Sequence, residues 1–196
     1  MYKLQVRLQK LICLMALVSG TVMFVYSLGM LTDLYDMLYS MIPDPDELDK
    51  ARVAGARIYY DMQPFNRYLL YCGIGLIVLS CVLFLTNTHK RRRYYVGNYI
   101  ATGLNVVCQL AAAWYMHVNV AKFKHIYLTT VDFAQLERRL SRVGTYTDST
   151  FWFDVHTFVF GLAILACILL VANMIWKFSL MKKEQHLIDA GKGVAA

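Results

Sequence analysis

Four long apolar stretches alternate with polar segments along the chain. They lie at about residues 11–31, 68–86, 97–117 and 153–176. Each is close to the ~20 residues that an α-helix needs to cross the hydrocarbon core of a bilayer. The pattern predicts an all-α membrane protein, in which residues 1–196 form a single four-pass domain. A short connection between the second and third spans, and longer polar segments after the first and third, predict four antiparallel transmembrane helices arranged as a four-helix bundle.

Two polar segments, at about 32–67 and 118–152, follow the first and third spans. In the first, which Pro43 and Pro64 bound, acidic residues favour a helix N-terminus and predict a short surface helix over residues 46–60. In the second, residues 122–143 keep a helical rhythm with apolar residues on one side. We expect these segments to form a small helical extracytoplasmic cap.

The third span carries the best-specified polar feature of the chain. Asn98, Thr102, Asn105 and Gln109 recur at intervals of four, three and four residues in an otherwise apolar sequence. This spacing places all four on one face of a helix. Because lipid offers an amide no hydrogen-bond partner, that face should turn toward other helices or toward water. We call these four residues the polar stripe.

Two interpretations of the polar stripe remain open. The stripe can join helices to one another, or it can line a path for a substrate. Ion and proton paths usually contain an ionisable residue, and none joins the stripe or occupies the core of the other three spans in this pattern. The sequence therefore favours the interhelical role.

The first span follows a basic N-terminus, as a signal peptide would. Its apolar run of 21 residues is longer than a typical signal-peptide core, so we expect a retained span. Cys13, Ala16, Gly20 and Ser27 share one face of it, and this small-residue strip allows a neighbouring helix to approach closely.

Positive charge is distributed unevenly along the chain, whose net charge is +7. With both termini and the turn at Lys90, Arg91, Arg92 and Arg93 on one side, that side has a net charge of +9 and the other −2. The positive-inside rule then predicts cytoplasmic termini, and we expect the plasma membrane. The basic turn either determines topology or contacts lipid head groups. Its position between two spans gives no reason to expect nucleic acid.

Two groups outside the stripe are candidates for chemistry or binding. His117, Asp154 and His156 lie near the outer ends of the third and fourth spans, with His125 and Asp148 in the polar segment between them. Their spacing matches no metal or catalytic motif, so we expect no metal site.

The second group lies in the outer helix over residues 122–143. It either caps the protein's own first polar segment or docks a partner. The residues assigned to docking are Phe133, Leu136, Leu140, Arg138, Arg139 and Arg142.

The functional expectation is a non-catalytic membrane subunit that stabilises or regulates a larger complex such as a transporter. Its partners would be membrane lipid and either another integral membrane protein or further copies of itself. The alternative is a small homo-oligomeric channel or carrier lined by the third span. A membrane enzyme that uses His117, Asp154 and His156 is a third hypothesis. The chain lacks the common hydrolase, metalloprotease, nucleotide-binding and C-x-x-C motifs, so we expect neither catalysis nor a cofactor.

Overall fold

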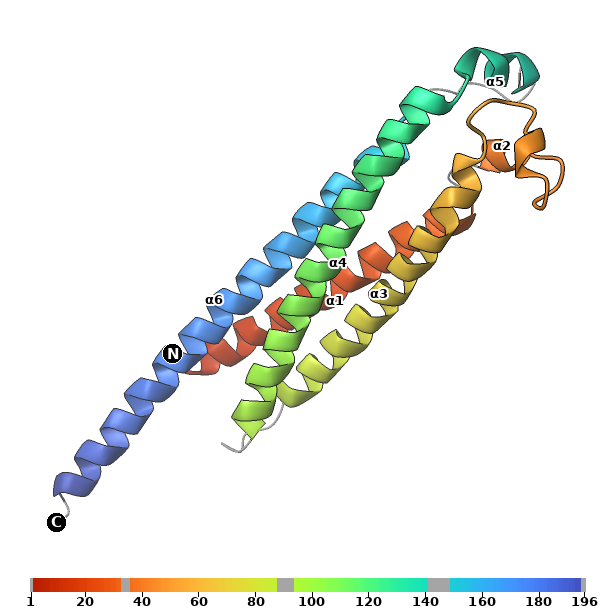
Figure 1. The fold of residues 1–196 in the computed structure, drawn as a ribbon. Helices are drawn as coiled ribbons and strands as arrows, with labels where there is room; N and C mark the ends of the chain where they lie inside the picture. Colours follow the sequence, from red (N-terminus) through yellow and green to blue (C-terminus); the bar gives the residue numbers. More distant parts are fainter. Residues whose placement is uncertain (1, 33–35, 88–93, 141–148, 195–196) are drawn as a thin grey trace. The chain divides into compact units, whose positions relative to one another are not determined.

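The computed structural model describes residues 2–32, 36–87, 94–140 and 149–194, and all regular structure in these ranges is helical (Figure 1). The four long helices are α1 (Tyr2–Thr32), α3 (Ile58–Asn87), α4 (Tyr94–Thr130) and α6 (Phe151–Val194). Three short ones are α2 (Asp36–Tyr39), the 3-10 helix η1 (Leu48–Lys50) and α5 (Phe133–Leu140).

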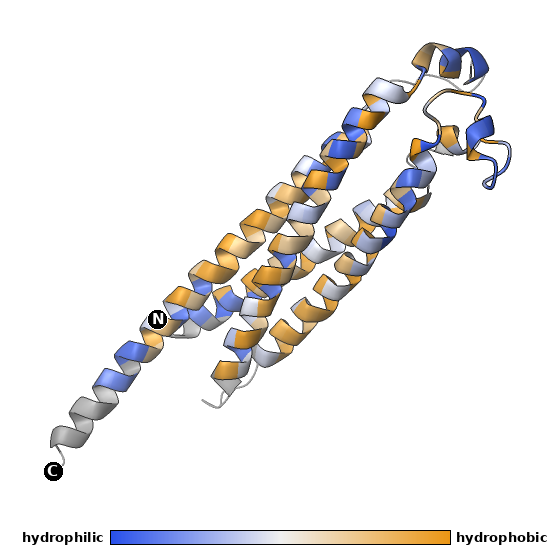
Figure 2. Cartoon of the chain, in the orientation of Figure 1, coloured by the Kyte–Doolittle hydropathy of each residue, from blue (hydrophilic) through white to orange (hydrophobic). Residues whose placement is uncertain are grey.

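Among the described residues, three helices are long and apolar enough to cross a membrane. The candidate spans are Arg7–Leu31 in α1, Ile58–Thr86 in α3 and Phe151–Lys183 in α6. They indicate a helical membrane protein. Helix α4 has the length but is not among the three, and Figure 2 shows hydrophilic residues recurring along it. The polar stripe lies on this helix, and its amides lower the mean hydropathy.

The chain divides into two compact units, and each long helix contributes a segment to both. Unit 1 contains residues 1–20, 75–110 and 162–196, and unit 2 contains residues 21–74 and 111–161. In unit 1, a core of small and aliphatic side chains comes from all four long helices. Its buried members are Cys13, Ala16, Leu83, Ala101 and Leu170.

Side-chain hydrogen bonds in unit 1 give the directions of its helices. Between α1 and α4, Gln9 pairs with Asn98 and Ser19 with Gln109. The residue numbers increase together, so these two helices run parallel. Between α3 and α4, Thr86 pairs with Asn98 and Ser80 with Asn105, so these two helices run antiparallel. Helix α6 likewise runs opposite to α4, because Lys177 pairs with Asn98 and Cys167 with Val106.

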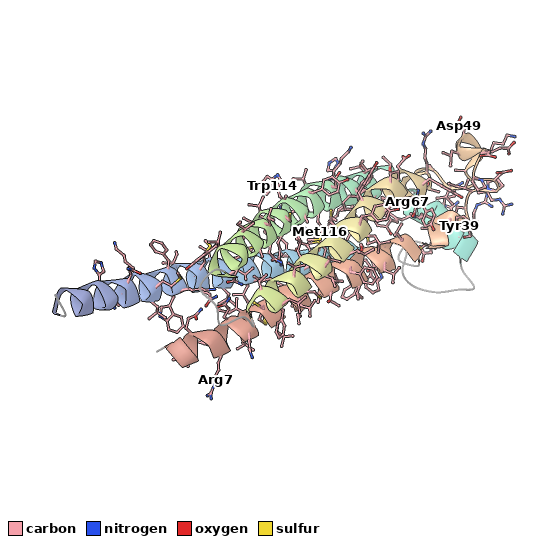
Figure 3. All side chains as sticks on the ribbon, turned by 90° about the horizontal axis from the view of Figure 1, so that it is seen from below. Arg7, Tyr39, Asp49, Arg67, Trp114 and Met116 are labelled. Carbon is pink, nitrogen blue, oxygen red and sulfur yellow. The ribbon has the colours of Figure 1, made fainter. Side chains whose placement is uncertain are left out.

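Aromatic rings dominate the interior of unit 2. The ring of Phe65 on α3 lies 5.5 Å from that of Tyr115 and 5.7 Å from that of Phe123. Tyr127 contacts Phe133 and Phe153 at centroid distances of 5.1 and 5.3 Å. On α4, Met116 is fully buried, whereas Trp114 is 65% exposed (Figure 3).

The first polar segment differs from the prediction. No helix spans residues 46–60: the chain forms the single turn η1 and further turns, and α3 begins at Ile58. Pro64 lies inside α3 rather than at its boundary. The helix continues through this proline because Met62, Phe65 and Leu69 are all buried, and this packing outweighs the loss of one backbone hydrogen bond near the helix start.

The second polar segment also differs from the prediction. The prediction of one continuous helix over residues 122–143 is wrong. Helix α4 continues to Thr130, the chain bends at Val131 and Asp132, and α5 follows. The Asp132 carboxylate accepts a hydrogen bond from the Gln135 backbone N–H at 2.9 Å, which is the geometry of a helix N-cap. Asp132 N–H donates to the Ala54 carbonyl at 3.1 Å, so the bend attaches to the first polar segment.

Gly55 makes this attachment sterically feasible. Its φ is +78°, and a Cβ placed there would clash with the Thr130 carbonyl. Only glycine adopts this backbone conformation without strain and leaves room for the neighbouring chain. Within unit 2, the two polar segments therefore pack on each other.

Candidate functional site

The structure buries the whole polar stripe. Asn98, Thr102, Asn105 and Gln109 are between 0% and 5% exposed. The Asn105 amide donates to Ser80 Oγ on α3 at 3.0 Å, and the Gln109 amide donates to Ser19 Oγ on α1. Thr102 donates back to the Asn98 carbonyl of its own helix at 2.7 Å. Three of the four side chains thus hydrogen-bond to residues of other helices.

Asn98 is the point in unit 1 where all four long helices meet through hydrogen bonds. Its Oδ1 accepts from Lys177 Nζ on α6 at 2.6 Å and from Gln9 Nε2 on α1 at 2.8 Å. Its Nδ2 donates to Thr86 Oγ1 on α3 at 3.1 Å. One planar side chain therefore constrains three neighbouring helices relative to α4, because donors and acceptors fit the amide in only one orientation.

Further polar residues extend this arrangement. Gln5 donates to Gln9 Oε1 at 2.9 Å and to Asn173 Oδ1 at 3.1 Å. The Lys177 ammonium lies 5.4 Å from the centroid of the Tyr99 ring, a cation–π distance. We define the Asn98 cluster as the six hydrogen-bonded residues Gln5, Gln9, Thr86, Asn98, Asn173 and Lys177.

The participation of Lys177 corrects the expectation that no ionisable residue joins the stripe. The sequence pattern placed Lys177 at the inner face just beyond the fourth span, where lysine normally extends toward water. In the structure it is 6% exposed and donates to Asn98. Burial of an ammonium group is costly unless polar groups solvate it, and the Asn98 carbonyl and the Tyr99 ring do so here.

Of the six members of the Asn98 cluster, only Asn98 was among the site residues predicted from the sequence. Gln5 and Gln9 are separated by four residues, and so are Asn173 and Lys177. The same spacing rule that identified the stripe would have identified these pairs as single-face features. Gln5, Gln9 and Lys177 lie just outside the predicted spans and Asn173 lies in the last turn of the fourth, where polar residues ordinarily contact head groups and water.

Farther along the stripe, two acceptors lack hydrogen bonds. Asn105 Oδ1 and Gln109 Oε1 are buried and have no partner among the described residues, and both side chains are 0% exposed. Each amide therefore uses its nitrogen but not its oxygen. Such atoms are uncommon in folded proteins, because an unpaired buried carbonyl retains its full desolvation cost.

In unit 2, the structure brings His117 and His156 together. His156 Nδ1 faces the Phe153 carbonyl, which can only accept, and His156 Nε2 lies 3.2 Å from His117 Nδ1. When His156 is neutral, its Nε2 is therefore the acceptor of this pair. Asp154 instead bonds Lys124 at 2.5 Å and Thr150 at 2.7 Å. Within the described ranges, no group of three or more His, Cys, Asp or Glu residues has the geometry for a metal ion.

The residues assigned to docking separate into two sets. Leu136 is fully buried and Phe133 packs on Tyr127, whereas Arg138 and Arg139 on the same helix are exposed. Leu140 ends α5, and its side chain lies outside the described residues, as does Arg142. The basic turn from Lys90 to Arg93 also lies outside them, as does Asp148.

The chain matches no family model, no curated protein and no solved structure.

Proposed function

We propose that the chain crosses the membrane four times, with α4 as the additional span. The distribution of residues on α4 supports this. Its large apolar side chains point outward, with Ile100, Leu104 and Val107 between 51% and 65% exposed, while the polar stripe is buried. A helix with apolar residues outside and amides inside suits lipid and would be unfavourable in water. The charge distribution of the sequence supports cytoplasmic termini.

We further propose that the protein is a non-catalytic subunit that stabilises or regulates a larger membrane complex, its partner being another integral membrane protein. The observation that carries this proposal is the Asn98 cluster. Its amides, the Thr86 hydroxyl and the Lys177 ammonium hydrogen-bond to one another across α1, α3, α4 and α6. Polar groups that are hydrogen-bonded to one another inside the protein stabilise its helix packing. The apolar outer surface and the exposed side chains of α5 then remain for association with a partner protein.

The test is purification from the native membrane in a mild detergent, with the stoichiometry of the associated proteins measured. We expect one partner protein to co-purify with this chain at a fixed molar ratio. In the reciprocal experiment, in which the partner carries the affinity tag, this chain should co-purify with it. Arg138→Glu with Arg139→Glu tests whether α5 docks, and Arg67→Glu, at an exposed arginine of α3, is the control. A stable assembly containing only copies of this chain would contradict the proposal.

A second candidate function, a small homo-oligomeric channel or carrier, is favoured by a specific observation. Lys177 adds a positive charge to the polar residues of unit 1, and the buried oxygens of Asn105 and Gln109 have no partner in the described ranges. Charged and incompletely paired groups inside a membrane protein often mark solute paths.

Substitution of Asn105 and Gln109 by leucine separates the two functions. If the protein is a subunit, the double variant changes stability or assembly and no solute flux depends on it. If it is a carrier, purified protein in liposomes shows a flux that the variant abolishes while the oligomer persists.

A further inference from the structure

Asn105 and Gln109 each use only one end of the side-chain amide. Asn105 Nδ2 donates to Ser80 Oγ at 3.0 Å, and Gln109 Nε2 donates to Ser19 Oγ. Their carbonyl oxygens have no partner among the described residues, although both side chains are 0% exposed. Exchanging the nitrogen and oxygen of either amide would leave the nitrogen unpaired instead. Within the part of the chain that the structure describes, one polar end of each side chain is therefore left without a protein partner.

The two unpaired oxygens belong to residues that are one helical turn apart. Residues four apart on a helix lie on the same face, with Cβ atoms about 5–6 Å from each other. The two carbonyl groups therefore belong to side chains on the same buried face of α4. The serine residues that receive the amide N–H groups belong to α1 and α3, so the location is enclosed by helices of unit 1.

The chemistry of the location selects the donor. Cations bound by oxygen ligands usually need carboxylates, and no Asp or Glu lies within residues 1–32, 62–131 or 155–183. The Lys177 ammonium at the other end of the same stripe disfavours a second positive charge. A lipid chain offers no donor. Water supplies two O–H groups, and buried waters typically bond otherwise unsatisfied polar groups.

We propose an internal water site at Asn105 and Gln109, where water O–H groups donate to Asn105 Oδ1 and Gln109 Oε1. This inference goes beyond the proposed function, because it holds whether the protein is an accessory subunit or a carrier. It assigns these two side chains a ligand and explains why amides occupy positions where leucine would pack without an unpaired atom.

The experiment is infrared spectroscopy of the full chain in lipid nanodiscs, with exchange from ordinary water to H₂¹⁸O. Internal water gives a sharp O–H stretching band that shifts with the isotope. We expect such a band in the wild type, its loss in Gln109→Met, and its loss or displacement in Asn105→Leu. Asn119→Leu is the matched control, because the Asn119 amide bonds the backbone of its own helix, and it should retain the band.

Bands of unchanged position and intensity in both stripe variants would overturn the proposal. Should either variant fail to fold, an experimental structure of the wild type decides the question. A solvent peak within hydrogen-bond distance of Asn105 Oδ1 or Gln109 Oε1 supports the site. A filled core without solvent there, or a peak that appears only with added sodium, contradicts it.

Discussion

The same four helices are held together by different chemistry in the two units. In unit 1, the buried residues of α4 include Asn98, Asn105 and Gln109, whose amides bond α1, α3 and α6. In unit 2, α4 instead buries Phe123 and Tyr127, which contact rings from other elements. A single continuous helix therefore changes from amide pairing to aromatic packing along its length.

This difference shows two ways of specifying helix packing in a membrane. Apolar side chains gain little by leaving lipid for protein, so packing must come from shape or from directional bonds. Hydrogen bonds specify which residues pair, and the partners in unit 1 are determined by donor and acceptor chemistry. Rings and close backbone contacts specify shape, and unit 2 depends on both.

The largest expected effect comes from removing a ring in unit 2. Phe65 is 4% exposed and contacts Tyr115 and Phe123, so Phe65→Ala leaves a cavity that costs about 3–5 kcal/mol. The measurement is the free energy of unfolding in mixed micelles. Phe158→Ala is the control, since that side chain is 66% exposed and its loss should matter little. Equal losses in the two variants would show that the rings of unit 2 do not support its packing.

The corresponding change in unit 1 is Asn98→Leu. It removes the acceptor for Lys177 and Gln9 together, and bonds to charged groups contribute about 1.5–3 kcal/mol each. We expect a loss of roughly 3 kcal/mol in the free energy of unfolding. The thiols of Cys13 and Cys167, which are buried in unit 1, should also react faster with a maleimide. Unaltered reactivity together with wild-type stability would refute the role of Asn98.

Close approach of helices in unit 2 is tested at Gly73 of α3, and Gly75, which lies in unit 1, provides the comparison. A Cβ at Gly73 would lie 2.8 Å from the Phe24 Cα, whereas a Cβ at Gly75 would meet nothing within 4 Å. Gly73→Ala should cost about 1–3 kcal/mol, because backbone must move to accommodate the methyl group. Gly75→Ala should instead stabilise the helix by up to about 1 kcal/mol. Thermal unfolding of both variants provides the comparison, and the same sign for both would contradict it.

The smallest effect is expected for a single neutral hydrogen bond in unit 1. Ser80→Ala removes the acceptor of the Asn105 amide, and such bonds average about 0.6 kcal/mol in a membrane protein. Ser179→Ala is the control, because that hydroxyl is exposed and bonds its own helix. A loss as large as that for Asn98→Leu would remove the distinction between neutral and charged bonds.

The helical class and the apolar segments could be predicted from the sequence, because length and periodicity depend on local composition. The helix boundaries in the two polar segments could not be predicted in this way. Pro64 is a local signal for a boundary, yet buried residues around it maintain α3, and the bend at Asp132 depends on contact with Ala54. These are tertiary effects that one segment does not encode by itself.

The candidate site was likewise predictable in its local pattern but not in its tertiary contacts. The spacing within α4 identified the stripe, but its partners lie on three other helices. Lys177 follows Trp176 at the end of an apolar run, which is the usual position of an interfacial anchor. Its inward orientation depends on Asn98 and Tyr99, which are far away in the sequence.

The central claim is that the stripe joins helices through Asn98, and a double-mutant cycle tests it most directly. The free energy of unfolding is measured for the wild type, Asn98→Leu, Lys177→Met and the double variant. The account predicts a coupling energy above about 1 kcal/mol, with the double variant more stable than Asn98→Leu alone, because no ammonium then remains buried without the Asn98 acceptor. Additive losses would mean that the two side chains do not interact, and the Asn98 cluster would not hold unit 1 together.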